Sequence, residues 1–369
     1  MTTDTRPPAP HHWIMNLPRP ILAGLAKCYA LGVRLRLALY HTGYLKSRRL
    51  NTMTISVGNI TVGGTGKTPL VEYLARALTG QGYKVAILTR GYGRKHPRRR
   101  QLVSDGEKIL DDAHLAGDEP LLLAKHLPGV IIVADAHRYE AGRWVEQRYA
   151  PDVIILDDGF QHLALERHLD LLVIDALDPF GGEHPLPLGR LREPLSEMTR
   201  TSAIVITHAD RPFDQSGLTM SIQALAGDKP VFYAYREATG LLNPRSEERV
   251  PPQRLERRRI AVFCAIGQPM RFVEDVSHFG ARVVAHRAFP DHHFFSQDDL
   301  HRVYARARRA GAEWILTTEK DWMRLRSLDL PSDPPLWVVQ SELRLIDEAR
   351  FMSFILRKVM EETAKPPSD

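Results

Sequence analysis

The sequence contains little cysteine and no uninterrupted apolar run of about twenty residues, the length that a membrane-spanning helix needs. Its two cysteines, Cys28 and Cys264, stand in unrelated contexts, with neither a C-x-x-C pair nor a histidine at ligand spacing. This pattern argues against a disulfide framework and a structural zinc site, and it fits a reducing cytoplasm. Residues 1–11 are polar and proline-rich, so they lack the apolar stretch of a secretory signal.

An excess of acidic charge is also missing. The chain has 50 Lys and Arg against 44 Asp and Glu, a formal net charge of +6 over 369 residues. This balance indicates an anionic partner such as nucleic acid, acidic lipid or a phosphorylated substrate. The basic run from Arg94 to Arg100 suits an anionic lipid surface, but no aromatic platform or known nucleic-acid module accompanies it. We therefore expect no nucleic-acid partner.

A helix-length apolar segment, residues 13–44, precedes the rest of the chain. Three cations interrupt it, namely Lys27, Arg34 and Arg36. We expect an amphipathic helix at a membrane surface, with aromatic side chains near the headgroups and the cations against anionic lipid. The aromatic residues are Trp13, Tyr29, Tyr40 and Tyr44. The same pattern also fits a helix packed on the protein's own core.

Short β-branched runs alternate with helical stretches from Asn51 onward. The runs are Met53 to Val57, Val85 to Thr89, Val130 to Ala134, Val153 to Leu156, Leu171 to Ile174 and Ala203 to Thr207, and the helical stretches include Pro69 to Leu78 and Arg138 to Tyr149. Continuous apolar strands separated by helices predict an α/β fold with a mostly parallel sheet buried on both faces.

Composition divides the chain into four expected parts. Residues 1–50 form a tail and the amphipathic helix, and residues 51–224 form the α/β core. Residues 225–257 are polar around one possible strand, Val231 to Tyr235, and we expect a linker there. A second β/α alternation predicts a smaller C-terminal α/β domain over residues 258–369. Its runs are Ile260 to Ala265, Val283 to Ala288 and Trp314 to Thr317, with helices over Met270 to Phe279 and Gln297 to Gly311.

The strongest local signal is a glycine-rich segment between the first strand and the helix at Pro69. It is a P-loop variant, with Thr61 at the position of the usual first glycine. In such loops backbone amides and a helix N-terminus bind phosphates, the lysine reaches the β- and γ-phosphates, and the following hydroxyl ligates Mg²⁺. We expect nucleotide binding by Thr61, Val62, Gly63, Gly64, Thr65, Gly66, Lys67 and Thr68. The alternative is a tight turn without a ligand.

Another core strand ends in two carboxylates. Asp157 and Asp158 follow the apolar run Val153 to Leu156. A carboxylate at a strand tip beside a P-loop can hold Mg²⁺ directly or through water, or orient the acceptor. The Asp158-Gly159 pair also suits a plain turn, and the sequence leaves open which aspartate faces the metal.

Six motifs stand in a fixed order over most of residues 50–325. They are Ser56 to Pro69, Leu88-Thr89-Arg90-Gly91-Tyr92-Gly93-Arg94, Gly117-Asp118-Glu119-Pro120, Asp157-Asp158-Gly159-Phe160-Gln161-His162, Leu191-Arg192-Glu193-Pro194 and Phe289-Pro290-Asp291-His292-His293-Phe294. Together they resemble the tetraacyldisaccharide 4′-kinases of lipid A biosynthesis. The resemblance implies ATP- and Mg²⁺-dependent phosphorylation of the 4′-hydroxyl of an acylated glucosamine disaccharide 1-phosphate, forming lipid IVA. It places the enzyme at the cytoplasmic face of the bacterial inner membrane and implies no obligate protein partner.

The resemblance also assigns catalytic roles. It makes Asp118 the base that accepts the hydroxyl proton, with His292 of the smaller domain as its partner, and it adds Lys67 as a catalytic cation. Catalysis would then require the two domains to close. Without the resemblance, Asp118 fits a helix cap equally well, and a lone histidine such as His292 is commonly structural.

The same motifs supply candidate contacts to the anionic disaccharide or to nucleotide phosphates. These are Arg90, Tyr92, Arg138, Gln161, His162, Arg192 and Glu193, with Arg94 as a further candidate. Arginine offers bidentate contact to phosphate, although any one of these arginines can be a solvated surface charge.

Two other P-loop classes remain as alternatives. The loop resembles that of partner-regulated ATPases with a deviant Walker A motif, but Val62 occupies the position of their signature lysine. The stretch Thr207-His208-Ala209-Asp210 resembles the guanine-reading [NT]-K-x-D motif of GTPases, with histidine in place of lysine.

Overall fold

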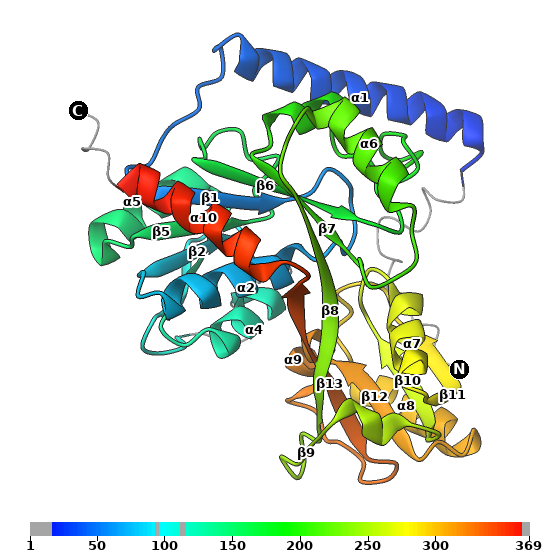
Figure 1. Ribbon diagram of the computed structural model, residues 1–369. Coiled ribbons are helices and arrows are strands. Elements are labelled where there is room, and N and C mark those ends of the chain that lie inside the picture. The colour runs from blue at the N-terminus through cyan, green and yellow to red at the C-terminus, as the bar shows by residue number, and fades with distance from the viewer. Residues whose placement is uncertain (1–16, 93, 95, 111–115, 364–369) are drawn as a thin grey trace.

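The computed structural model describes residues 17–92, 94, 96–110 and 116–363. Over these residues thirteen strands form one sheet in the order β11-β10-β12-β13-β8-β7-β6-β1-β5-β2-β4-β3, with β9 beside β8 (Figure 1). The strands are β1 (Met53–Gly58), β2 (Val85–Thr89), β3 (Gln101–Asp105), β4 (Ile131–Ala134), β5 (Val153–Asp157), β6 (Leu169–Asp175), β7 (Ala203–Thr207), β8 (Val231–Leu242), β9 (Arg249–Val250), β10 (Arg259–Cys264), β11 (Arg282–Ala288), β12 (Trp314–Thr318) and β13 (Leu336–Leu345). The helices are α1 (Arg19–His41), α2 (Lys67–Gly80), α4 (Asp118–His126), α5 (Arg138–Tyr149), α6 (Gln215–Ala226), α7 (Pro269–His278), α8 (Gln297–Arg309), α9 (Glu319–Leu325) and α10 (Glu348–Thr363), with 3₁₀ helices η2 (Leu195–Arg200) and η3 (Pro252–Leu255).

The α/β core predicted from the sequence is confirmed. Strands β6, β1, β5, β2 and β4 pair in parallel, and every residue in them is buried. Helices α2, α4 and α10 pack on one face of this sheet, while α5 and α6 pack on the other. Burial on both faces explains why these strands are mostly apolar.

The segment 225–257 carries a long strand where a polar linker was expected. The strand expected over Val231 to Tyr235 extends much further as β8, which pairs first with β7 in parallel and then with β13 antiparallel. Figure 1 shows β8 and β13 running side by side from one half of the molecule to the other. The exposed Glu237 pairs with Arg344 across this ribbon at 2.8 Å. A solvated ribbon needs polar side chains, which is why its sequence resembles that of a linker.

The smaller half contains β10, β11 and β12, flanked by α7 and α8, as the second β/α alternation predicts. Helix α10 differs from the expected arrangement, because it packs on the core of the first half. Its buried residues recur at helical spacing and join the cluster that contains β1; they are Phe351, Phe354, Ile355 and Val359. The expected C-terminal unit therefore lacks this helix, and we propose that it comprises residues 258–345.

Helix α1 lies along the outside of the first half (Figure 1). Among its described residues only Ala26 and Leu37 are buried, whereas Leu31 and Leu35 are 69% and 61% exposed. The helix is therefore not a core helix, although one side of it contacts the protein. Trp13, expected in this segment, lies outside the described residues. No helix in the described part of the chain is long and apolar enough to cross a membrane.

Candidate active site

The glycine-rich loop lies between β1 and α2, as the sequence predicts. Two buried hydrogen bonds hold its centre: Asn59 Nδ2 donates to Thr65 Oγ1 at 2.9 Å, and Thr207 Oγ1 donates to the Thr65 carbonyl at 2.9 Å. Gly66 precedes the first turn of α2 with φ of +88°, and a Cβ there would lie 3.0 Å from Thr207 Cγ2. The loop therefore requires glycine at position 66, both for its backbone and for the close approach of β7.

The beginning of the loop is tied to the Leu-Arg-Glu-Pro motif. Thr61 forms an isolated antiparallel bridge with Leu191, the Val62 amide donates to the Arg190 carbonyl at 2.8 Å, and the Arg192 amide donates to the Ile60 carbonyl at 2.8 Å. These contacts bring the 190–192 segment against the phosphate loop and explain how two motifs far apart in sequence serve one site.

Lys67, at the first position of α2, faces the carboxylate of Asp158. Its Nζ lies 3.7 Å from Asp158 Oδ1, and Arg192 Nη1 donates to both oxygens of the same carboxylate at 2.8 and 2.9 Å. Burial lowers the pKa of Lys67, while Asp158 opposes that shift. Asp158 has φ of +54°, an uncommon backbone conformation for a residue other than glycine. Two cations thus converge on Asp158.

Asp157 occupies a different environment from Asp158. Thr68 Oγ1 lies 3.5 Å from its Oδ1, and Thr89 Oγ1 lies 3.3 Å from its Oδ2. Burial, with the charges of Glu119 and Asp158, raises the pKa of Asp157 to about 7. A buried carboxylate beside a hydroxyl, with no cation paired to it among the described residues, fits a divalent cation, which would restore the charge balance.

The expected pair Asp118 and His292 is brought together by the two halves of the chain. His292 Nδ1 lies 3.6 Å from Asp118 Oδ2. His292 has φ of +60°, and its amide donates to Asp291 Oδ1 at 3.0 Å. Gly117, the residue before Asp118, has φ of +91°, and a Cβ there would lie 2.9 Å from the Tyr92 carbonyl oxygen. The motif that contains Asp118 therefore packs closely on the loop that contains Tyr92.

Arg324 of α9 is a site residue that the sequence did not indicate. Its Nε donates to Asp118 Oδ2 at 2.8 Å, and its Nη2 donates to the same oxygen. Burial alone would raise the pKa of Asp118, but His292, Arg324 and Lys320 outweigh burial and hold that pKa well below its ordinary value. Lys320 also contacts Glu119, with Nζ 2.6 Å from Oε1.

These two groups of residues adjoin through the loop that follows β10. A Cβ at Gly267 would lie 3.5 Å from Asp291 Oδ2 and 3.9 Å from the Gly64 amide nitrogen. The neighbour of His292 and the phosphate loop therefore face the same loop of the smaller half. The glycine-rich loop and the expected base thus lie close to the same segment of the smaller half.

Most of the remaining candidates also surround this site. Gln161 Nε2 donates to the Asn59 carbonyl at 2.8 Å, and Arg90 Nη1 donates to Tyr92 Oη at 2.8 Å. Arg138 is buried, and burial lowers its pKa against the opposing charge of Asp157. Burial and the charge of Arg138 lower the pKa of His162 to about 4, so this imidazole is neutral at physiological pH.

Two of the candidate substrate-binding residues, Glu193 and Arg94, have polar groups that are bound to other parts of the protein. Glu193 is buried and paired with Arg200, and burial raises its pKa. Arg94 donates to the carbonyls of Ala134 and Arg99 at 2.6 and 2.8 Å. Both side chains therefore support neighbouring segments of the fold.

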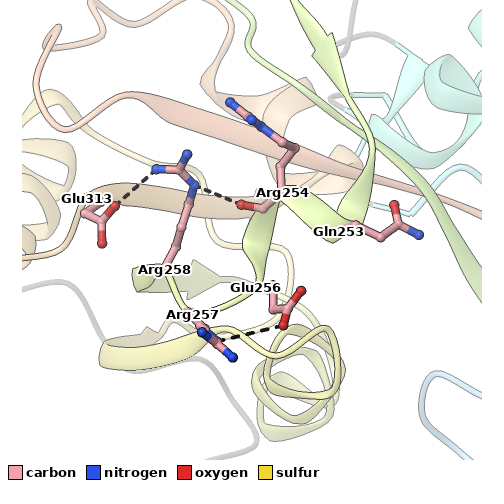
Figure 2. Close-up of a pocket in the computed structure, with 6 residues that line it drawn as sticks. All are labelled: Gln253, Arg254, Glu256, Arg257, Arg258 and Glu313. Carbon is pink, nitrogen blue, oxygen red and sulfur yellow. Dashed lines mark hydrogen bonds and ion pairs between the residues drawn. The ribbon is translucent and has the colours of Figure 1, made fainter.

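An open depression lies in the smaller half, outside this site. Figure 2 shows Arg258 between Glu313, at 3.1 Å, and the Arg254 carbonyl, at 2.8 Å. Arg257 lies 3.9 Å from Glu256, and Gln253 completes the lining. None of the expected site residues lines this depression, so we assign it no role.

Known proteins resemble this chain over nearly its whole length. A family model described as tetraacyldisaccharide-1-P 4′-kinase matches residues 18–360. A tetraacyldisaccharide 4′-kinase of Pelobacter propionicus is 36% identical over 350 residues, covering 95% of this chain and 94% of that protein. One from Anaeromyxobacter dehalogenans is 40% identical over 322 residues, covering 85% of each. A crystal structure of LpxK from Aquifex aeolicus in complex with ATP matches with a TM-score of 0.71 and 34% identity, covering 92% of this chain and 99% of that one.

Proposed function

This chain belongs to the tetraacyldisaccharide-1-phosphate 4′-kinase family, and we propose on that premise that it phosphorylates the 4′-hydroxyl of a tetraacylated glucosamine disaccharide 1-phosphate with ATP. The observation that carries the proposal is that the phosphate loop lies close to a buried carboxylate, Asp118, and to a histidine, His292, which come from opposite halves of the chain. In the reaction the 4′-oxygen forms a bond to the γ-phosphorus, the bond to the β,γ-bridging oxygen breaks, and ADP leaves.

The phosphate loop provides binding and charge for the nucleotide. The loop amides, the N-terminus of α2 and Lys67 hold the β- and γ-phosphates. Thr68 and Asp157 would hold Mg²⁺, which would neutralise charge on the transferring phosphoryl group. We assign the metal to Asp157 because Lys67 and Arg192 already occupy Asp158. In this assignment Asp158 orients Lys67 and Arg192 around the phosphates.

Asp118 accepts the proton of the 4′-hydroxyl, with His292 beside it. Its low pKa keeps it ionised throughout the physiological range, so it is always able to accept a hydrogen bond from the hydroxyl. In a loose phosphoryl-transfer transition state the nucleophile needs little activation before the bond to phosphorus forms. A weak base in the right position is therefore sufficient.

The acceptor binds beside Asp157 and Asp158. It contacts the residues that the family resemblance identifies as candidates for substrate binding. Arg90, Tyr92 and Arg138 supply cations and an aromatic edge, and Gln161, His162 and Arg192 supply polar contacts. Glu193 contributes indirectly, because it fixes Arg200 and thereby the segment that follows Arg192. A neutral His162 suits contact with sugar hydroxyls, since it can both donate and accept hydrogen bonds.

Helix α1 holds the enzyme at the cytoplasmic face of the inner membrane, where the acylated substrate resides. Ile21, Leu25 and Leu35 share one exposed face at helical spacing, and Lys27 and Arg34 are exposed as well. An exposed apolar face with neighbouring cations suits an anionic lipid surface. On the protein side, Tyr29 Oη donates to the Arg192 carbonyl at 3.0 Å and Arg36 Nη2 donates to the Gln161 carbonyl at 2.8 Å. The lipid-facing helix is thus linked to the acceptor site.

The test is to incubate the purified chain with γ-labelled ATP, Mg²⁺ and a bacterial lipid extract. We expect one labelled lipid, whose mass equals that of a tetraacylated disaccharide 1-phosphate plus one phosphate. Label recovered only as inorganic phosphate, with or without lipid, would contradict a kinase and would favour an ATPase instead.

A further inference from the structure

Arg324 joins the smaller half to the expected base. The side chain is 1% exposed, and its guanidinium contacts three groups that come from different segments. Nε and Nη2 donate to Asp118 Oδ2, while Nη1 donates to the Ala265 carbonyl at 3.2 Å and to Asp321 Oδ1 at 3.3 Å. Asp321 is itself fixed by the Ala265 amide at 3.1 Å and by Thr318 Oγ1 at 2.7 Å. The guanidinium therefore cannot turn without breaking several buried hydrogen bonds.

The two carboxylate oxygens of Asp118 have different surroundings. Oδ2 receives Arg324 and lies 3.6 Å from His292 Nδ1, whereas no described residue donates to Oδ1. No described backbone amide donates to the Asp118 carboxylate either, so the helix-cap role that the sequence allowed does not account for its position at the start of α4. His292 Nδ1 is likewise buried without a hydrogen-bond partner among the described residues.

We propose that Arg324 is a positioning residue for phosphoryl transfer: it holds Asp118 by Oδ2 so that Oδ1 faces the acceptor hydroxyl and takes its proton. This inference rests on the proposed kinase function. An ion pair that served stability alone would not require Asp118, because Asp321 already provides a buried carboxylate for the same guanidinium. The second carboxylate lets Arg324 remain neutralised after Asp118 has taken up the proton.

Loss of the Arg324 charge should raise the pKa of Asp118. The charged or titratable groups facing Asp118 are Glu119 on its own helix, Lys320, Asp321 and Arg324 on α9, and Asp291 and His292 on the loop after β11. Removal of the Arg324 charge takes away one of the influences that oppose burial and leaves only His292 and Lys320 against it, so the pKa of Asp118 rises. The protonated and inactive form then persists to higher pH.

The experiment compares Arg324→Gln, Arg324→Lys and the matched control Arg326→Gln, which changes an exposed arginine at the end of the same helix. We measure kcat against pH at saturating ATP and lipid, together with ATP affinity. Arg324→Gln should lower kcat on the order of 10²-fold with ATP affinity little changed. It should also raise the pKa of Asp118 toward its ordinary value or above, so that kcat relative to the wild type falls further at the acidic end of the pH range. Arg324→Lys should leave the pH dependence of kcat near that of the wild type while kcat falls, and Arg326→Gln should match the wild type.

Asp118→Asn provides an independent readout if Arg324→Gln does not fold. Arg324 would bind the amide oxygen and turn the NH₂ group toward the acceptor, so Asp118→Asn should be no more active than Asp118→Ala. An Arg324→Gln enzyme with wild-type kcat and pH profile, or an Asp118→Asn enzyme well above Asp118→Ala, would overturn the inference. A wild-type chain that transfers no phosphate would instead contradict the proposed function.

Discussion

Lys67 Nζ lies 3.7 Å from Asp158 Oδ1, so the lysine of the phosphate loop rests against a carboxylate at the end of β5. The side chains are only 12% and 17% exposed, and Arg192 shares the same carboxylate. Asp158 therefore keeps two cations at the place where the γ-phosphate is expected to bind.

The first prediction is that Lys67→Ala and Thr68→Ala each abolish turnover without loss of the fold. Each substitution removes a phosphate or metal contact from the site and leaves the core clusters intact. Loss of transition-state charge stabilisation of this kind typically lowers kcat on the order of 10²-fold or more. Lys108→Ala, in an exposed turn, is the control. Near-normal turnover by either site variant would remove the phosphate-loop assignment.

The second prediction concerns pH and Mg²⁺. In the proposed site the metal would bind the carboxylate form of Asp157, whose pKa is about 7, so that metal binding would displace the proton from any protonated Asp157. Apparent affinity for Mg²⁺ with nucleotide should therefore weaken as pH falls from 8 to 6, approaching about tenfold per pH unit. Titration calorimetry across this range measures the slope.

Asp157→Asn supplies the control for that slope. Protonation of the nucleotide affects the measurements on the wild type and on Asp157→Asn equally. The difference between their two slopes of Mg²⁺ affinity against pH therefore reports the Asp157 carboxylate alone. Equal slopes for the wild type and Asp157→Asn would show that Asp157 does not bind the metal, and the assignment would pass to Asp158.

The third prediction is that α1 provides membrane binding. Leu31→Glu with Leu35→Glu, or deletion of residues 1–41, should weaken binding to vesicles that contain anionic lipid much more than it weakens ATP binding. Ile346→Glu is the matched control, because Ile346 and Leu35 are both 61% exposed. If the α1 variants sediment with the vesicles as well as the wild type does, α1 does not bind the membrane and its role is structural only.

The fourth prediction is that Asp118 and His292 act as one unit. Asp118→Ala and His292→Ala should each lower kcat, by roughly 10² to 10⁴-fold for loss of the base, with smaller effects on apparent ATP affinity. The double variant should be little worse than the poorer single variant. Strictly multiplicative losses in the double-mutant cycle would separate the two residues, and a fully active His292→Ala enzyme would exclude His292 from the chemistry.

The buried strands of the larger half were predictable from the sequence. The expected runs Val85 to Thr89 and Ala203 to Thr207 coincide with β2 and β7, because burial on both faces demands continuous apolar residues. In the smaller half the prediction was mixed: the expected run Val283 to Ala288 is β11, although none of its residues is buried, and β13 was not expected, although its first four residues are buried. The antiparallel edge strand β3 and the ribbon formed by β8 and β13 carry mixed side chains, since water covers part of them. Such strands are specified by their partners, which a local pattern does not reveal.

The residues of the candidate site also differ in how far the sequence predicted them. Lys67, Thr68 and the two aspartates at the end of β5 were predictable because each belongs to a short motif whose neighbours fix its geometry. Asp118 and His292 were paired only through the family resemblance. Arg324 carried no signal at all, because nothing in its local sequence distinguishes it from the exposed Arg326; its burial arises from the packing of α9 between the two halves of the chain.

The most direct measurement of the central claim is phosphoryl transfer to two matched acceptors. The wild-type chain in mixed micelles, with γ-labelled ATP and Mg²⁺, is given either tetraacylated disaccharide 1-phosphate or the same lipid with its 4′-hydroxyl methylated, and Lys67→Ala provides the blank. We predict labelled lipid from the first acceptor and none from the second or from the blank. Equal labelling of both acceptors, or release of labelled inorganic phosphate without any labelled lipid, would contradict the assignment as a 4′-kinase.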